Sequence, residues 1–155
     1  MMFSDFLDGI KKEHPEISFI DSDNFCWKGS TKTISYIMPR KKDEELRAAA
    51  QILHELGHAL LNHTDYSSDV ELLKLESSAW EQASRLAHKL QIELPKDEIE
   101  QSLQSYINWA SSRSLCPKCK KNGLQIMQTE FYCLSCDRLW RVSRSRFTRT
   151  YRKQT

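Results

Sequence analysis

The segment His54-Glu55-Leu56-Gly57-His58 places two imidazoles and a carboxylate within one helical turn. Residues four apart on a helix are separated by about 400°, so the rings of His54 and His58 leave the same face one turn apart. Apolar residues recur around them with helical spacing and predict a helix over residues 43–63. Two histidines and a glutamate on so apolar a helix indicate a chemical role, because burying them without partners is unfavourable.

Two imidazoles at this spacing can bind one zinc ion, while Glu55 reaches a water on that ion rather than the ion itself. The motif therefore predicts a catalytic zinc ion with His54 and His58 as ligands and Glu55 as the general base of peptide hydrolysis. A nearby donor must stabilise the oxyanion of the reaction. Proximity in the sequence makes His63 and Tyr66 the candidates for this oxyanion or pocket role.

A catalytic zinc ion usually has a third protein ligand. His63 follows His58 by five residues, which on a continuing helix turns its ring through about 500° and away from the metal-binding face. Glu76 is better placed, on a second helix predicted over residues 70–90 that can pack against the first. The spacing leaves three other acidic residues open as competing ligands: Asp69, Glu71 and Glu81.

The remaining pattern predicts an α+β, zincin-like fold with a small antiparallel sheet beside the helices. Apolar spacing predicts a helix over residues 3–13 and another that begins at Pro95. Short apolar and β-branched runs predict three strands, at residues 17–20, 25–27 and 33–37. These elements fill residues 1–112, the predicted metallopeptidase-like domain, and the polar residues 111–114 indicate a linker.

Four of the 5 cysteines follow the spacing C-x₂-C-x₁₃-C-x₂-C in the C-terminal part of the chain. Each pair can offer two thiolates to one tetrahedral ion, and four thiolates leave no open position for a substrate. Residues 113–155 are therefore predicted to form a zinc ribbon, with a structural zinc ion bound by Cys116, Cys119, Cys133 and Cys136. Runs at 124–127 and 130–132 predict its hairpin, whereas Cys26 stands apart as a small apolar residue.

Charge is divided unevenly along the chain. Residues 1–112 hold 12 basic and 19 acidic residues, and residues 113–155 hold 11 basic and 2 acidic residues. Arginines interleaved with aromatic residues suit phosphate contacts and base stacking, although a solvated tail or one docked on the acidic domain has the same composition. The candidate nucleic-acid contacts are Arg138, Arg141, Arg144, Arg146, Arg149 and Arg152.

The run from Ile52 to His63, followed by Glu76-x-x-Ala79, resembles the ImmA/IrrE family of metallopeptidases. The resemblance extends over residues 17–90 and implies that His54, His58 and Glu76 bind the zinc ion while Glu55 acts as the base. It also implies a protein substrate, namely a regulatory DNA-binding protein of the repressor type.

The cysteine module lies outside that pattern and is similar to the ribbon of SprT-type proteases, which act near DNA. SprT-like domains use a further downstream histidine, for which the sequence offers only His88. A SprT-like protease is therefore the second interpretation. A third is a non-catalytic regulator whose zinc ribbon binds nucleic acid or protein.

The ends and the hydropathy of the chain bear on its location. Residues 1–10 contain Asp5 and Asp8 and no basic stretch, which is unlike a secretory signal. No run approaches the roughly 20 apolar residues of a membrane span. The sequence thus predicts a cytoplasmic protein without a membrane partner. A DNA-bound repressor is the substrate that the ImmA/IrrE resemblance implies, and nucleic-acid contact through the basic tail stays one of the alternatives given above.

Overall fold

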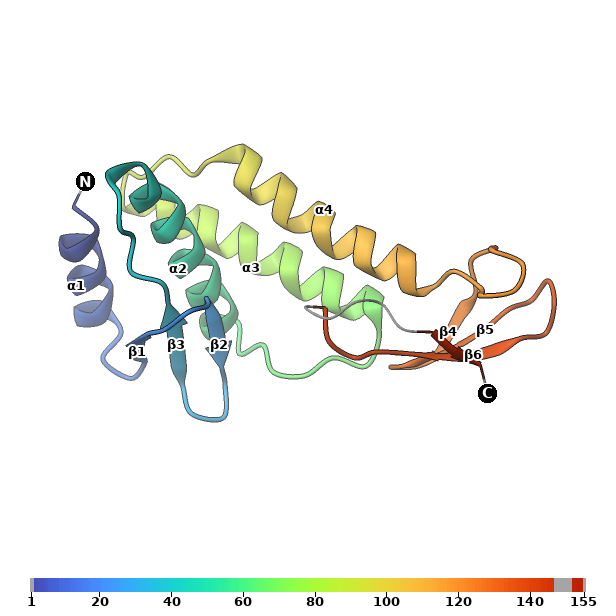
Figure 1. The fold of residues 1–155 in the computed structure, drawn as a ribbon. Helices are drawn as coiled ribbons and strands as arrows, with labels where there is room; N and C mark the ends of the chain where they lie inside the picture. Colours follow the sequence, from blue (N-terminus) through green and yellow to red (C-terminus); the bar gives the residue numbers. More distant parts are fainter. Residues whose placement is uncertain (1, 147–151, 155) are drawn as a thin grey trace. The chain divides into compact units, whose positions relative to one another are not determined.

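The computed structural model describes residues 2–146 and 152–154, which form two compact units (Figure 1). The first unit comprises Met1–Asp65 and Leu75–Glu100, and the second comprises Tyr66–Lys74 and Gln101–Thr155. Helices α3 (Asp69–Lys89) and α4 (Lys96–Arg113) each contribute residues to both units. The fold is α+β, as predicted, while the domain boundary between residues 112 and 113 stays a prediction.

The first unit contains a three-stranded sheet in the order β1-β3-β2, formed by Ser18–Asp21, Thr33–Tyr36 and Cys26–Lys28. The antiparallel pairing is confirmed for β2 and β3. It was wrong for β1, which runs parallel to β3. Because β3 lies between them, β1 and β2 run in opposite directions without pairing with each other.

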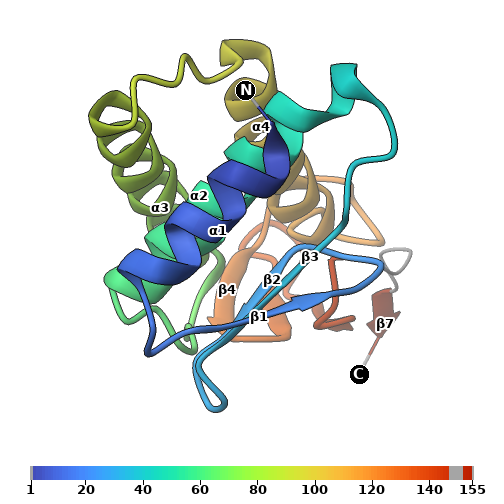
Figure 2. The same ribbon diagram turned by 90° about the vertical axis from the view of Figure 1, so that its left-hand side faces the viewer.

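Helix α2 (Glu45–Leu60) is the centre of the first unit. It packs against α1 (Phe3–Glu13) and against β2 and β3 (Figure 2). Its apolar face is fully buried at Ile52, Leu53 and Leu56. The helices predicted at 3–13 and 43–63 are confirmed, although a 3-10 turn (Lys42–Glu44) precedes α2 and the helix ends three residues early. None of the helices in the described ranges is long and apolar enough to cross a membrane.

Helix α3 approaches α2 very closely at Gly57. A β-carbon built on Gly57 would lie 2.5 Å from the carbonyl oxygen of Ala79, well inside van der Waals contact. The absence of a side chain at position 57 therefore sets the spacing of the two helices. This contact fixes the height and distance at which side chains of α3 meet those of α2.

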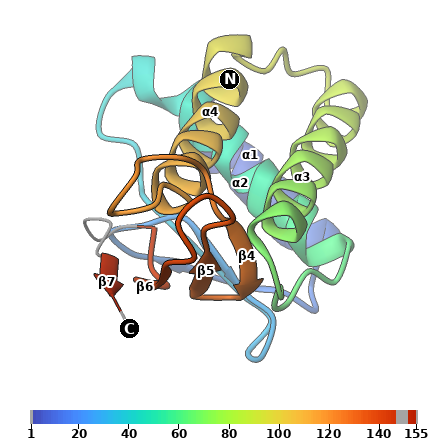
Figure 3. The ribbon, with the colours of Figure 1, turned by 90° about the vertical axis from the view of Figure 1, so that its right-hand side faces the viewer.

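The second unit contains an antiparallel sheet in the order β4-β5-β6-β7 (Figure 3). Its core is the stacked pair Phe131 and Trp140, with ring centroids 5.6 Å apart, together with Val142 and two of the cysteines. The predicted hairpin is confirmed as the first two strands. The strand bounds are Leu124–Met127, Glu130–Tyr132, Leu139–Val142 and Arg152–Gln154.

The linker predicted at residues 111–114 was wrong, because α4 continues to Arg113. The Arg113 side chain is only 1% exposed and lies over the ring of Trp109 at 4.2 Å. Its guanidinium donates a hydrogen bond to the carbonyl of Gln128 (2.8 Å) and lies 3.5 Å from the Asp69 carboxylate. Tertiary contacts of one arginine thus extend a helix through a segment whose composition is typical of a loop.

The contact at Gly57 leads to a prediction about stability. Gly57→Ala should lower the free energy of unfolding by about 1–3 kcal/mol, because the added methyl group forces α3 away from α2. Gly9→Ala is the matched control, since Gly9 is an exposed position of α1 with no heavy atom within 4 Å of a β-carbon built there. This control should gain up to about 1 kcal/mol from helix propensity. Urea denaturation of the two variants measures both effects, and equal stabilisation would contradict the packing argument.

Candidate metal centres

Three side-chain donors converge between α2 and α3 in the first unit. His54 Nε2 lies 3.2 Å from His58 Nε2 and 3.1 Å from Glu76 Oε2. His58 Nε2 lies 3.5 Å from Glu76 Oε1. Two imidazole nitrogens and a carboxylate oxygen at these separations form a donor set that could hold one metal ion, and it is one of the sets in which zinc is bound in proteins.

Packing against α3 holds the His54 ring in place. The His54 ring stacks on Trp80, with ring centroids 4.2 Å apart and planes inclined by 24°. Glu76 and Trp80 are one turn apart on α3. The same face of this helix therefore supplies the donor Glu76 and the indole ring on which the donor His54 stacks. The sequence signals this role of Trp80 only through its four-residue spacing from Glu76, which is equally typical of core packing.

The other candidate ligands lie elsewhere. Asp69 is buried in the second unit, and its carboxylate accepts a hydrogen bond from the side chain of Gln125. Glu71 accepts hydrogen bonds from the backbone and hydroxyl of Ser67, and the histidine expected for a SprT-like site, His88, is exposed on α3. Glu81 pairs with Arg85 on the same helix. Glu76 is therefore the acidic residue that the fold brings to the histidine pair.

Burial and pairing set the ionisation of this group. Burial alone would raise the pKa of Glu76, but hydrogen bonds from His54 and His58 lower it to about 2. Burial opposes the charged form of His58, yet its hydrogen bond to Glu76 and the nearby carboxylates of Glu76 and Glu55 raise its pKa. The carboxylate is therefore anionic over a wide pH range and ready to bind a cation.

Glu55 is held by the edge strand of the sheet. Its Oε2 accepts a hydrogen bond from the backbone N–H of Trp27 in β2 at 2.7 Å. One carboxylate oxygen of Glu55 is thus held by the sheet. The residue lies on the turn of α2 that carries His54 and His58. This non-local contact, across 28 residues of sequence, has no signature in the motif.

His63 was expected to point away from the metal-binding face, and this expectation was wrong. Helix α2 ends at Leu60, and Asn62 adopts a left-handed conformation (φ 53°) that turns the chain back. The His63 ring then lies with Nδ1 at 2.9 Å from His58 Nδ1. The other oxyanion candidate, Tyr66, belongs to the second unit, where its carbonyl accepts a hydrogen bond from Gln128.

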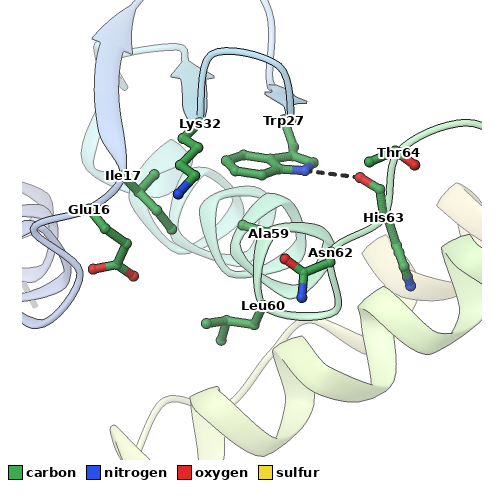
Figure 4. A pocket seen from close by; sticks show the side chains of 10 residues that line it. Glu16, Ile17, Trp27, Lys32, Ala59, Leu60, Asn62, His63 and Thr64 are labelled. Atoms are coloured by element: carbon green, nitrogen blue, oxygen red, sulfur yellow. Dashed lines mark hydrogen bonds between the residues drawn. The ribbon is translucent and has the colours of Figure 1, made fainter.

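A cavity of about 270 Å³ lies at the C-terminal end of α2 (Figure 4). Ile17, Trp27 and Leu60 give it apolar walls, and Glu16 and Lys32 add charge. The indole Nε1 of Trp27 donates a hydrogen bond to the carbonyl of His63 at 3.1 Å, which closes one side. His63 is one of the residues that line this cavity, and its ring contacts His58 of the donor set. Its role at an oxyanion or in a substrate pocket stays a prediction.

The second unit holds the other candidate metal centre. The four sulfur atoms of Cys116, Cys119, Cys133 and Cys136 lie within 4.8 Å of one another. Although burial raises the pKa of Cys116, hydrogen bonds from the backbone at Cys119 and Lys118 lower it to about 6. These backbone hydrogen bonds favour the thiolate form of Cys116, which is the form that binds a metal ion. The four cysteines together fit a structural metal ion with four sulfur ligands. Cys26, which lies outside this group in the first unit, is partly buried.

Arg141 and Arg146, which are among the arginines proposed for nucleic-acid contact, have partners within the second unit, and Arg138 and Arg144 also take part in interactions. Arg141 donates to the Glu130 carboxylate at 2.7 Å. Arg146 lies over the ring of Tyr106 at 3.9 Å and donates to the hydroxyl of Ser105 at 3.0 Å. Arg138 and the exposed Arg144 belong to the same unit. Arg149 and the side chain of Arg152 lie outside the described residues, as do the aromatic residues Phe147 and Tyr151.

Comparisons with known proteins add no evidence about function, so the geometry of the two donor sets is the principal evidence. No protein-family model matches the chain, and neither a curated protein nor a solved structure shows significant similarity to it.

The pKa values of the donor set predict how pH affects the metal-free protein. Glu76, whose folded pKa is depressed from 4.5, contributes stability above pH 4.5, and this contribution is lost as pH falls toward 2. His58, whose pKa is raised from 6.5, contributes stability below pH 6.5 and loses it as pH rises through the raised value. Glu76→Gln should therefore be most destabilising between pH 4.5 and 6.5, by at most about 3 kcal/mol.

Urea denaturation of wild type and Glu76→Gln at a series of pH values between 2 and 8 measures the difference. The cysteine module is common to both proteins, so its own pH dependence cancels. A difference that stays constant between pH 2 and pH 8 would show that Glu76 is not paired with the histidines.

Proposed function

We propose that this chain is a zinc-dependent metalloendopeptidase with a zincin-like core. The observation that carries the proposal is the convergence of His54, His58 and Glu76 with Glu55 held beside them. Among the residues that the structure describes, the set consists of two imidazoles and one carboxylate with no fourth protein ligand, which is typical of catalytic rather than structural zinc. The resemblance of the same segment to the ImmA/IrrE metallopeptidases supports the assignment.

The residues of the chain divide the work of peptide hydrolysis. His54, His58 and Glu76 would hold the zinc ion, which would supply Lewis acidity to polarise a carbonyl and to lower the pKa of water. The hydrogen bond from Trp27 fixes Oε2 of Glu55, so Oε1 is the atom expected to accept a proton from the attacking water. The same oxygen then returns the proton to the leaving amine. Burial of Glu55, which is 9% exposed, excludes competing solvent from this transfer.

The substrate we propose is a regulatory DNA-binding protein of the repressor type. The cavity beside His63 has the size and the apolar walls to receive one side chain of an extended substrate segment. The ribbon and basic tail would bring the enzyme to a substrate on DNA through phosphate contacts, in the cytoplasm. The carboxylate in the donor set favours this ImmA/IrrE-like assignment over a SprT-like protease, which would require a histidine there.

Glu55→Gln tests catalysis directly. The amide keeps the shape and the hydrogen bond from Trp27 but cannot accept a proton, so cleavage should fall by about 10²–10⁴-fold. The measurement is mass-spectrometric identification of new N-termini after the zinc-loaded protein is incubated with a native lysate containing DNA-binding proteins. Glu93→Gln, at an exposed position, is the matched control and should cleave as wild type does.

Zinc content is measured on the same samples, so that loss of activity is separated from loss of metal. New N-termini that persist unchanged in Glu55→Gln would refute the assigned base. Wild type that holds zinc at this site and generates no new N-terminus would favour the regulator, whose zinc ribbon binds a partner without cleavage.

A further inference from the structure

A chain of three hydrogen bonds leads away from the donor set on the side of His58 that faces His63. His58 Nδ1 lies 2.9 Å from His63 Nδ1. The opposite nitrogen of His63, Nε2, lies 3.4 Å from the hydroxyl of Ser78. That hydroxyl donates to the carbonyl oxygen of Leu75 at 3.0 Å. Donors and acceptors must alternate along such a chain. The Leu75 carbonyl can only accept, so it determines which nitrogen of His58 carries a proton at the other end.

The direction of each bond follows from the number of protons available. Ser78 has one hydroxyl proton, which is directed at the carbonyl of Leu75, so its oxygen accepts from His63 Nε2–H. Neutral His63 then has a lone pair at Nδ1 and can only accept there. His58 Nδ1 must therefore carry a proton, which leaves the lone pair of His58 on Nε2, the atom that faces His54 and Glu76.

We propose that His63 is a positioning residue that fixes His58 in the Nδ1–H tautomer and so presents its Nε2 lone pair to the metal ion. This inference rests on the proposed zinc site. Ligating histidines are commonly oriented by a carboxylate or a backbone carbonyl at the second ring nitrogen. Here a second histidine takes that place, and a serine on the helix that carries Glu76 fixes the second histidine.

His63 does not act as an additional ligand in this arrangement. Both of its ring nitrogens are engaged, one with His58 and the other with Ser78. Its contact to His58 is made at Nδ1, the ring nitrogen opposite the one in the donor set. His54 is held differently, since within the described part of the chain its Nδ1 is buried without a hydrogen-bond partner and its ring stacks on Trp80.

The main chain holds His63 in place independently of its ring. Its backbone N–H donates to the carbonyl of His58 at 3.0 Å, and its own carbonyl accepts from the indole of Trp27 at 3.1 Å. Because these bonds do not involve the imidazole, substitutions at position 63 should preserve the turn after α2. Side-chain replacements at this position therefore test the hydrogen bond rather than the fold.

The test compares His63→Phe with His63→Asn. Phenylalanine keeps a ring but offers no acceptor, so zinc affinity at the donor set should fall by about 10–100-fold. Asparagine places Oδ1 where the imidazole carries Nδ1 and should keep the affinity within a few-fold of wild type. Zinc affinity is measured on the full chain by competition with a chelator of graded strength, and the four-cysteine site, whose affinity should not change, serves as the internal reference.

Three results would overturn the proposal. If His63→Phe binds zinc as tightly as wild type, His63 does not position His58, although the proposed metal site stands. If His63→Asn loses as much affinity as His63→Phe, the imidazole acts through packing rather than as an acceptor. If wild type binds only the ribbon ion, the metal site itself fails, and the inference fails with it. Recovery in His63→Asn alone is the result that supports the proposal.

Discussion

The bare backbone at Gly57 lets α3 lie against α2 at a distance that no other residue would permit. Glu76 and Trp80 lie on the part of α3 that makes this approach, and they reach His54 from two directions. Ser78, next to Ala79, reaches His63 from the same helix. One close backbone contact therefore positions a ligand, the stacking surface behind another ligand, and the end of a hydrogen-bond chain.

The local geometry of the site could be predicted from the sequence, because it depends on helical periodicity. Two histidines four residues apart share a helix face in any protein, and the apolar spacing around them shows that the helix is buried. The choice of Glu76 needed a resemblance to a family, since spacing alone left three acidic competitors. Only tertiary structure separates them, by turning the competitors toward partners of their own.

His63 and Trp27 show where prediction from the sequence ended. The orientation of His63 was wrong because the helix was taken to continue, whereas a left-handed residue at position 62 reverses the chain within one turn. The bond from Trp27 to Glu55 depends on which strand forms the edge of the sheet, and β3 takes the central place only through non-local pairing. Arg113 likewise extends α4 through contacts made far away in the sequence.

The grouping of the four cysteines could be predicted without tertiary information, because their spacing and the hairpin between the two pairs are local features of the sequence. The core of the ribbon around Phe131 and Trp140 is small, so we expect this module to depend on a bound metal ion for stability. The two candidate centres therefore differ in kind. Four sulfur ligands would complete the coordination of a metal ion in one centre, whereas the carboxylate and two imidazoles found among the described residues would leave a position open in the other.

The central claim is that this chain holds two metal ions in separate sites, and metal content per chain tests it most directly. Elemental analysis of protein purified without added zinc should give two zinc ions for wild type and for Cys26→Ser, whose thiol lies outside both donor sets. His58→Ala and Cys133→Ser should each give one. A single ion in wild type that persists in His58→Ala would contradict the account, because the histidine and glutamate donors would then hold no metal.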